Sequence, residues 1–286
     1  MQALRPCLYK RNWYYLATFF LTTIGIKNKF MGNMFDTQAY LQRINYHGST
    51  EPTSETLKAL HYQHMLTVPF ENLDISLGKS IVLNQDSFYQ KIVHQHRGGF
   101  CYELNGLFAQ LLKELGFQVT LLSGRVAIPA GGYGADFAHL TLLVEVDDYS
   151  WLVDVGFGDS FREPIGFGPV SEQVRNAYRL VAEEAGYWIL LQRPKLEQRE
   201  RALYLFTLEP KKLEDFKNLC LYQQTSPDSI FTKGRLCTKA TEEGRITLQD
   251  KELTIITATD KQVYPVADDR EFLALLAEHF AITLPS

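Results

Sequence analysis

The chain has 286 residues, close to the size at which a single hydrophobic core stops growing, so we expect one body built from two or three subdomains. Apolar residues make up 45% of the chain and charged residues 22%, which excludes a largely disordered protein. Lysine and arginine number 29 against 33 acidic residues, and the net charge of −4 argues against a nucleic-acid partner. The four cysteines are widely spaced, which fits a reducing cytoplasm and offers no zinc-ribbon spacing.

Residues 1–33 differ from the rest of the chain and are predicted to form an N-terminal extension. Three basic residues, Arg5, Lys10 and Arg11, precede an apolar stretch at 13–26. That stretch is shorter than the ~20 residues a membrane span needs, and no small-residue cleavage site of a signal peptide follows it. We therefore expect a cytoplasmic protein without a membrane anchor, with membrane association as the alternative.

Residues 34–118 carry mostly helical periodicity. Helix starts are expected at Asp36, Ser54 and Ser87. The clearest helix has apolar residues at i, i+3, i+4, i+7, i+8 and i+11, counted from Leu104, and Gly116 stands where its C-terminal glycine belongs.

The following residues are rich in β-branched and apolar side chains. Strands are expected at 118–127, 139–146, 151–155, 187–192 and 253–257, and a last helix at 269–280. Helices come first, then strands, then a mixed piece, and this order predicts an α+β fold rather than a doubly wound sheet.

Cys101 opens the helix that contains Leu104. Unpaired backbone N–H groups at a helix start favour an anion, so the position predicts a lowered pKa and a reactive thiolate. The alternative is an inert, buried cysteine. Among the histidines, His61 and His64 lie at i, i+3 on a predicted helix without a third metal ligand, whereas His139 begins an apolar strand.

A hairpin follows His139 and brings Asp154 back toward it. If Asp147 and Asp148 form a two-residue loop, paired positions sum to 295, and Asp154 becomes a diagonal neighbour of His139 on one face. A four-residue loop keeps the two on the same face but further apart, and a three-residue loop puts them on opposite faces. An aspartate beside the imidazole would hold its tautomer and stabilise its charged form.

Five segments, taken together, resemble the arylamine N-acetyltransferase family. They are RGGFCYELN at 97–105, VPFENL at 68–73, AHL at 138–140, VDVGFG at 153–158 and TSPDS at 225–229. The resemblance spans about residues 35–280. It implies an α+β architecture similar to that of cysteine proteases.

Three domains are implied by this resemblance. They are a helical bundle at 34–118, a β-barrel at 119–220 and an α/β lid at 221–286. Cys101, His139 and Asp154 are then a catalytic triad. Apart from the resemblance, Glu71 and Arg97 are expected to form a buried ion pair that steadies the loop before Cys101, with unrelated surface roles for each as the alternative.

The resemblance also implies ligand contacts. Phe70 would line the acceptor pocket and Tyr222 would touch coenzyme A. Apart from the resemblance, the glycine run at 131–134, which includes Gly131 and Gly132, would let a phosphate-bearing ligand approach the backbone. The competing interpretations are core packing for Phe70 and an ordinary turn for the glycines.

The implied activity is acetyl transfer from acetyl-CoA to small aromatic amines, hydrazines and N-hydroxyarylamines, with no metal. The mechanism would be ping-pong through an acetyl-cysteine. The same three side chains also serve thiol hydrolases and transglutaminase-like enzymes, which remain the runner-up, and a non-enzymatic binding module comes third. The 68–73 and 225–229 motifs favour the acetyltransferase.

Overall fold

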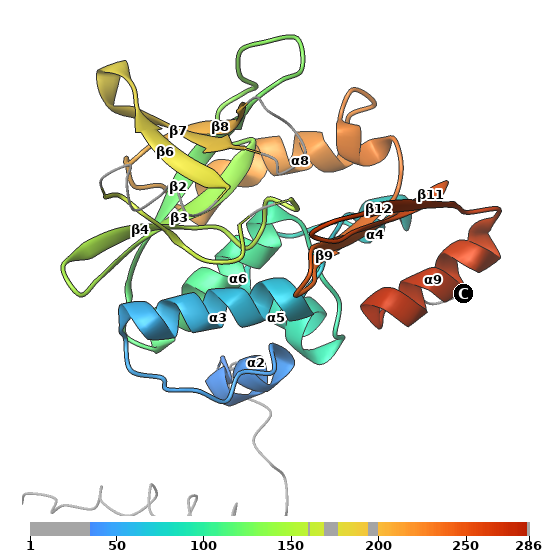
Figure 1. Cartoon of the computed structure of the whole chain (residues 1–286), viewed down its shortest axis with the longest axis horizontal. Helices are drawn as coiled ribbons and strands as arrows, with labels where there is room; N and C mark the ends of the chain where they lie inside the picture. The colour runs from blue at the N-terminus through green and yellow to red at the C-terminus, as the bar shows by residue number, and fades with distance from the viewer. Residues whose placement is uncertain (1–34, 160, 169–176, 194–199, 285–286) are drawn as a thin grey trace, which may run out of the picture. The chain divides into compact units, whose positions relative to one another are not determined.

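The computed structural model of the chain describes residues 35–159, 161–168, 177–193 and 200–284 (Figure 1). The chain divides into two compact units at residues 35 and 36, and the second unit carries the elements below. The predicted extension at 1–33 lies outside the described residues. Among the residues that are described, no helix is both long enough and apolar enough to span a membrane.

The first segment is helical, as predicted. Its helices are α2 (Thr37–Arg43), α3 (Ser54–Thr67), α4 (Leu73–Ser76), α5 (Gln85–Tyr89) and α6 (Cys101–Glu114), with a π-helical turn η1 (Gln90–His94) after α5. Asp36 caps α2 by accepting the N–H of Ala39, as expected from the sequence.

The predicted cap at Ser87 is wrong. Asn84 caps α5 instead, and its side chain accepts the N–H of Ser87 at 2.7 Å. Asparagine and serine are about equally good N-caps, so the sequence did not distinguish the two positions. The N-cap of α5 lies three residues before the predicted one. Gly116 ends α6 with φ +92°, a conformation that favours glycine.

Seven strands of the described chain form one antiparallel sheet in the order β5-β4-β3-β2-β8-β7-β6. They are β2 (Gln118–Val126), β3 (His139–Val146), β4 (Tyr149–Val153), β5 (Ile165–Gly166), β6 (Tyr178–Ala182), β7 (Tyr187–Gln192) and β8 (Arg201–Thr207). The two edge strands, β5 and β6, contact each other, so the sheet nearly closes into a barrel. Its interior is filled by Leu122, Leu152, Phe161, Ile165, Leu180, Leu190, Leu203, Tyr204 and Phe206.

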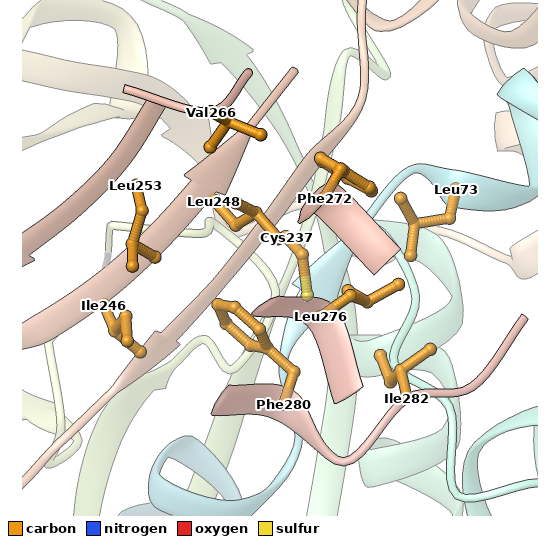
Figure 2. Close-up of a cluster of buried hydrophobic side chains, with 10 residues drawn as sticks. All are labelled: Leu73, Cys237, Ile246, Leu248, Leu253, Val266, Phe272, Leu276, Phe280 and Ile282. Atoms are coloured by element: carbon orange, nitrogen blue, oxygen red, sulfur yellow. The ribbon is translucent and has the colours of Figure 1, made fainter. Parts of the chain in front are cut away.

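A second sheet has the order β1-β9-β10-β11-β12. It joins β1 (Phe70–Glu71), from the helical segment, to β9 (Leu236–Ala240), β10 (Arg245–Gln249), β11 (Glu252–Ile256) and β12 (Lys261–Pro265). Helix α9 (Asp269–Phe280) packs on β9 and β10 (Figure 1). Figure 2 shows the apolar cluster between them, in which Phe272, Leu276 and Phe280 of the helix face Cys237 and Leu248 of the strands.

Between the sheets lies α8 (Lys217–Thr225) in the sequence, preceded by η3 (Leu213–Phe216) and followed by η4 (Ile230–Thr232). The predicted α+β class with a barrel is confirmed. The predicted domain limit between residues 220 and 221 falls inside α8, and β1 contributes to the sheet of the predicted lid.

Candidate active site

Cys101 is the first residue of α6 and is only 3% exposed. The preceding loop runs beside β1, because Phe70 pairs with Gly99 in a parallel bridge and the N–H of Glu71 donates to Gly99 O. A Cβ at Gly98 would lie 2.0 Å from the carbonyl oxygen of Pro69, so this close approach requires glycine. The close backbone approach explains Gly98, and at Gly99 a Cβ would lie 2.9 Å from the Glu103 side chain.

A cluster of buried charged side chains holds the loop before Cys101 in place. Arg97 reaches Glu71 at 2.7 Å and Asp74 at 3.1 Å, which confirms the expected Glu71–Arg97 pair. Lys91 contacts Asp74 at 2.8 Å and Glu103 at 2.9 Å. Burial opposes ionisation of Asp74, but the two cations outweigh burial and lower the pKa of its carboxyl. The cluster ties η1, α4 and the first turn of α6 together.

The hairpin that begins at His139 has the two-residue register. Val146 pairs with Tyr149 and Leu142 with Val153, and the turn residues Asp147 and Asp148 have φ of +54° and +60°. Of the three loop lengths compatible with the sequence, this one brings the aspartate closest to the histidine.

The expected His139–Asp154 contact is present. His139 Nε2 lies 2.7 Å from Asp154 Oδ2, and both side chains are almost wholly buried. Since the carboxylate can only accept, Nε2 carries the proton, and Nδ1 is the atom left to act as a base.

Asp154 is surrounded by donors. Oδ1 accepts from Asn105 Nδ2 at 2.8 Å and from the N–H of Gly156 at 3.0 Å. Oδ2 accepts from the Tyr204 hydroxyl at 2.9 Å as well as from His139. Burial would raise the pKa of this carboxyl, but His139, Asn105 and Gly156 outweigh it and lower the pKa. Asp154 is therefore a fixed negative charge behind the imidazole.

The hairpin meets the start of α6 at Gly156. A Cβ added there would lie 2.9 Å from Cys101 Cα and 2.7 Å from Asn105 Nδ2, so glycine permits the contact. Asn105 lies one turn after Cys101. Its Nδ2 donates to Leu140 O at 2.6 Å, and its Oδ1 accepts the N–H of Val155 at 2.9 Å. Helix α6 thus carries Cys101 and, through Asn105, forms hydrogen bonds to the residues that follow His139 and Asp154.

The electrostatics of Cys101 differ from the prediction made on helix position alone. Burial raises the pKa of its thiol, although the backbone N–H groups of Leu140 and Tyr102 favour the thiolate and partly offset that effect. The charge of Asp154 opposes the thiolate further. The helix start therefore does not ionise the thiol by itself, and reactivity needs an adjacent base.

Phe70 and Tyr222, both expected from the sequence to contact ligands, differ in their exposure to solvent. Phe70 is buried, its ring lies 6.2 Å from that of Phe231, and it packs beside Gly158. Tyr222 is 46% exposed on α8, and its neighbour Gln223 donates to Ala138 O, directly before His139. The structure thus brings Phe70 next to Gly158 at the end of the hairpin, whereas Tyr222 is exposed on α8 and the adjacent Gln223 makes the contact with the hairpin.

Gly131 and Gly132 lie on an exposed turn between β2 and β3, with φ of +95° and +82°. The N–H of Gly131 donates to Ile128 O and that of Ile128 to Gly132 O. The turn itself accounts for both glycines, so their contact with a ligand stays a prediction. No group of three or more potential metal ligands occurs within the ranges that the structure describes.

Comparison with known proteins identifies the family. A family model described as N-acetyltransferase matches residues 53–286. A chicken protein, arylamine N-acetyltransferase pineal gland isozyme NAT-3, is 37% identical over 87% of this chain and 94% of its own length. The chain belongs to the arylamine N-acetyltransferase family. It is accordingly an acyltransferase.

Other known proteins are similar to nearly the same extent. Proansamycin X synthase of Amycolatopsis mediterranei is 35% identical over 86% of this chain and 96% of its own. A solved structure of the Mycobacterium marinum arylamine N-acetyltransferase in complex with CoA superposes with a TM-score of 0.77 at 29% identity, over 86% and 93% of the two chains.

Three buried polar residues of this family member were not predicted to belong to the site. Asn105 had a visible signal, because it interrupts the apolar face that α6 presents at Leu104 and Leu107. Tyr204 lies in an apolar strand and gave no signal of its own. His61 had been considered only as half of a metal pair, yet its Nε2 accepts the backbone N–H of Asp154.

Proposed function

We propose that the chain transfers an acetyl group from acetyl-CoA to aromatic amines through an acetyl-cysteine at Cys101. The observation that carries the proposal is the hydrogen-bonded pair of His139 and Asp154, which Asn105 connects to the first turn of the helix that Cys101 begins. Family membership and the CoA complex of a relative support the donor. The proposal extends to hydrazines and to O-acetylation of N-hydroxyarylamines as acceptor chemistry.

In the first half-reaction His139 Nδ1 takes the proton of the Cys101 thiol. Because burial raises the pKa of that thiol, the proton leaves only when the imidazolium gains a counter-charge, which Asp154 supplies. The thiolate attacks the thioester carbonyl, and the N–H of Cys101 and backbone N–H groups near β3 stabilise the oxyanion. His139 then protonates the sulfur of the departing coenzyme A, leaving acetyl-Cys101.

In the second half-reaction the acceptor amine attacks the acetyl-cysteine. His139 removes a proton from the amine nitrogen and returns one to the Cys101 sulfur as the tetrahedral intermediate collapses. Phe70, packed with Phe231 beside Gly158, supplies an aromatic wall suited to a flat acceptor ring. Tyr222 is the proposed coenzyme A contact, together with the turn at Gly131 and Gly132.

Intact-mass measurement after mixing with acetyl-CoA, without acceptor, tests this function. One acetyl group should appear, peptide mapping should place it on Cys101, and Cys101→Ala should abolish it. Cys237→Ala is the matched control, because Cys237 is an equally buried free cysteine in the core under α9. An aromatic amine should then remove the acetyl group much faster than water does. Loss to water at the same rate would indicate the thiol hydrolase instead, and acetylation of Cys220 or Cys237 would refute the assignment.

A further inference from the structure

His61 is a buried histidine that no step of the proposed reaction uses. It lies in the middle of α3 and is 0% exposed. Its ring stacks on Phe161 with centroids 5.5 Å apart and planes 8° apart, and it meets Phe108 edge-on at 6.2 Å. The orientation of the imidazole plane is therefore set by packing on both sides.

Both ring nitrogens of His61 have backbone partners, and these partners define its protonation. Nδ1 lies 2.9 Å from Arg162 O, a carbonyl that can only accept, so Nδ1 carries the hydrogen. Nε2 lies 3.3 Å from the backbone N of Asp154, which can only donate, so Nε2 is unprotonated. Only the neutral Nδ1–H tautomer satisfies both contacts.

The charges around His61 agree with this neutral state. Burial lowers the pKa of His61 from 6.5 to about 4, although the Arg162 carbonyl and the Asp154 carboxylate favour its protonation. The ionisable groups that face it are Asp154 at the end of β4 and His64 on its own helix. The Arg162 guanidinium is directed elsewhere, to Thr241 O and Glu242 O.

The contact matters because Asp154 stands just beyond the last ladder pair of β4, which is Leu142 with Val153. The backbone N–H of Asp154 therefore lies outside the strand pairing, and it donates to His61 Nε2 instead. The same ring hydrogen-bonds to Arg162 O, so one side chain contacts the backbone at both Asp154 and Arg162. Gly156, two residues after Asp154, lies so close to the start of α6 that a Cβ there would be 2.9 Å from Cys101 Cα.

Helix α3 makes two further contacts with the β3–β4 hairpin. The N–H of Ser54 donates to Asp147 Oδ2 at 2.6 Å, and Lys58 Nζ lies 4.8 Å from the centre of the Trp151 ring. Residues 54, 58 and 61 follow i, i+4, i+7 spacing, so one stripe of α3 meets the hairpin from its turn to its end.

We infer that His61 is a positioning residue for the Cys101–His139–Asp154 site. As a neutral bridge with a hydrogen bond at each ring nitrogen, it holds the backbone of Asp154 so that the carboxylate stays 2.7 Å from His139 Nε2. The inference rests on the proposed function, in which Asp154 stabilises the imidazolium of His139. Its test therefore uses a readout that requires no acetyl-CoA.

That readout is alkylation of Cys101 by iodoacetamide, followed by mass spectrometry across pH. In His61→Leu the N–H of Asp154 and the carbonyl of Arg162 lose their partner, so alkylation at neutral pH should slow about 10-fold, the change in thiolate fraction that a one-unit rise in the effective pKa of the thiol gives. Its pH midpoint should move upward, toward that of an unassisted thiol, because His139 is less well supported as a cation. His61→Gln, whose amide can both accept and donate, should restore the rate to within about 3-fold.

His64→Leu is the matched control. His64 lies one turn further along α3, is equally buried and packs edge-on against the same Phe108, but its hydrogen bond goes to Tyr40, away from the hairpin. It should lower stability without changing the alkylation midpoint. An unchanged midpoint in folded His61→Leu, or an equal shift in His64→Leu, would overturn the inference. Loss of acetyl transfer with these alkylation results intact would instead count against the proposed function.

A measurement on the unaltered protein covers the case in which His61→Leu does not fold. The ¹⁵N chemical shifts of the His61 ring should report the neutral Nδ1–H tautomer from pH 5.5 to 8. Observation of the Nε2–H tautomer or of an imidazolium in that range would overturn the inference, because neither form can accept the N–H of Asp154.

Discussion

At the scale of single residues, the site depends on hydrogen-bond direction more than on the presence of ionisable side chains. Asp154 accepts four hydrogen bonds, and each comes from a group that donates. Such a carboxylate stays ionised in spite of burial, because every partner stabilises the charged form. His139 is consequently fixed with Nε2–H toward Asp154 and Nδ1 free for proton transfer.

Replacing Asp154 by asparagine should leave a folded protein that acylates very slowly. An amide nitrogen must face either the pair Asn105 and Gly156 or the pair His139 and Tyr204, and both pairs already donate. By analogy with the same change in a Ser-His-Asp triad, the acylation rate should fall about 10³- to 10⁴-fold. Stopped-flow acylation together with circular dichroism measures both effects. Asp136→Asn is the control, since Asp136 is exposed and pairs with Arg125 at 3.8 Å. Unchanged acylation in folded Asp154→Asn would mean that another group orients His139.

The buried histidines predict an acid-sensitive fold. His61 has a folded-state pKa of about 4 against 6.5 for the unfolded chain, so between these values the unfolded state binds more protons. Stability should therefore be full above pH 6.5 and fall as the pH drops toward 4, by about 3 kcal/mol from this residue.

Urea unfolding at a series of pH values measures this loss, and His61→Gln should remove part of it. His64, whose pKa burial also lowers, contributes in the same direction and remains in that variant. Asp154, with a lowered carboxyl pKa, loses its contribution only below about pH 4. Identical pH profiles for the two proteins would contradict the assignment to His61.

At the scale of elements, α3 and the β3–β4 hairpin behave as one unit. Asp147 connects them, because it occupies the first position of the hairpin turn, with φ +54°, and its side chain accepts the N–H of Ser54 at the start of α3. Helix α6 completes the unit through Asn105, so three elements distant in the sequence are fixed on each other around Cys101.

Asp147→Ala should destabilise the protein more than Asp148→Ala does. Both changes put alanine at a positive φ, +54° and +60°, and so cost similar strain. Only the first also leaves the N–H of Ser54 without its acceptor, which adds about 1 kcal/mol to the loss of unfolding free energy. Thermal and urea unfolding of the pair isolates this contact. Equal losses would mean that the helix-to-hairpin contact contributes nothing to stability.

At the scale of the whole molecule, the segment at residues 53–286 that matches the family model contains every residue named in the mechanism. The barrel contributes His139, Asp154 and Tyr204, the helical segment contributes Cys101 and Asn105, and the sheet under α9 is completed by β1, which carries Phe70. The proposed site therefore draws its residues from the barrel, from the helical segment and from β1 of the second sheet.

A chain that begins at Met34 should keep near-normal turnover with an aromatic amine. Residues 1–33 supply no nucleophile, base or aromatic wall in the mechanism above, and the family model starts at residue 53. Their apolar side chains still favour burial, at about 25 cal/mol per Å², so solubility is the property we expect removal to change. Steady-state kinetics on the shortened chain measures turnover. A soluble, folded and inactive product would show that the extension belongs to the active architecture.

The sequence alone predicted most of the elements and the three side chains proposed to react, because these depend on local spacing. Helix periodicity placed Cys101 at the first turn of α6, and alternation along the hairpin put His139 and Asp154 on one face once the turn length was known. Motif order then identified the family and the barrel.

Only the tertiary structure decided what surrounds those side chains. Asn105, Tyr204 and His61 come from three elements, and no spacing rule relates them to Asp154, because hydrogen bonds between elements depend on how helices and strands pack. The raised pKa of the Cys101 thiol has the same origin. The helix start is a local feature that favours the anion, whereas desolvation reflects the whole surrounding core, and the core outweighs the helix. The reactivity that we propose for Cys101 therefore depends on the tertiary structure, which places His139 and Asp154 beside each other.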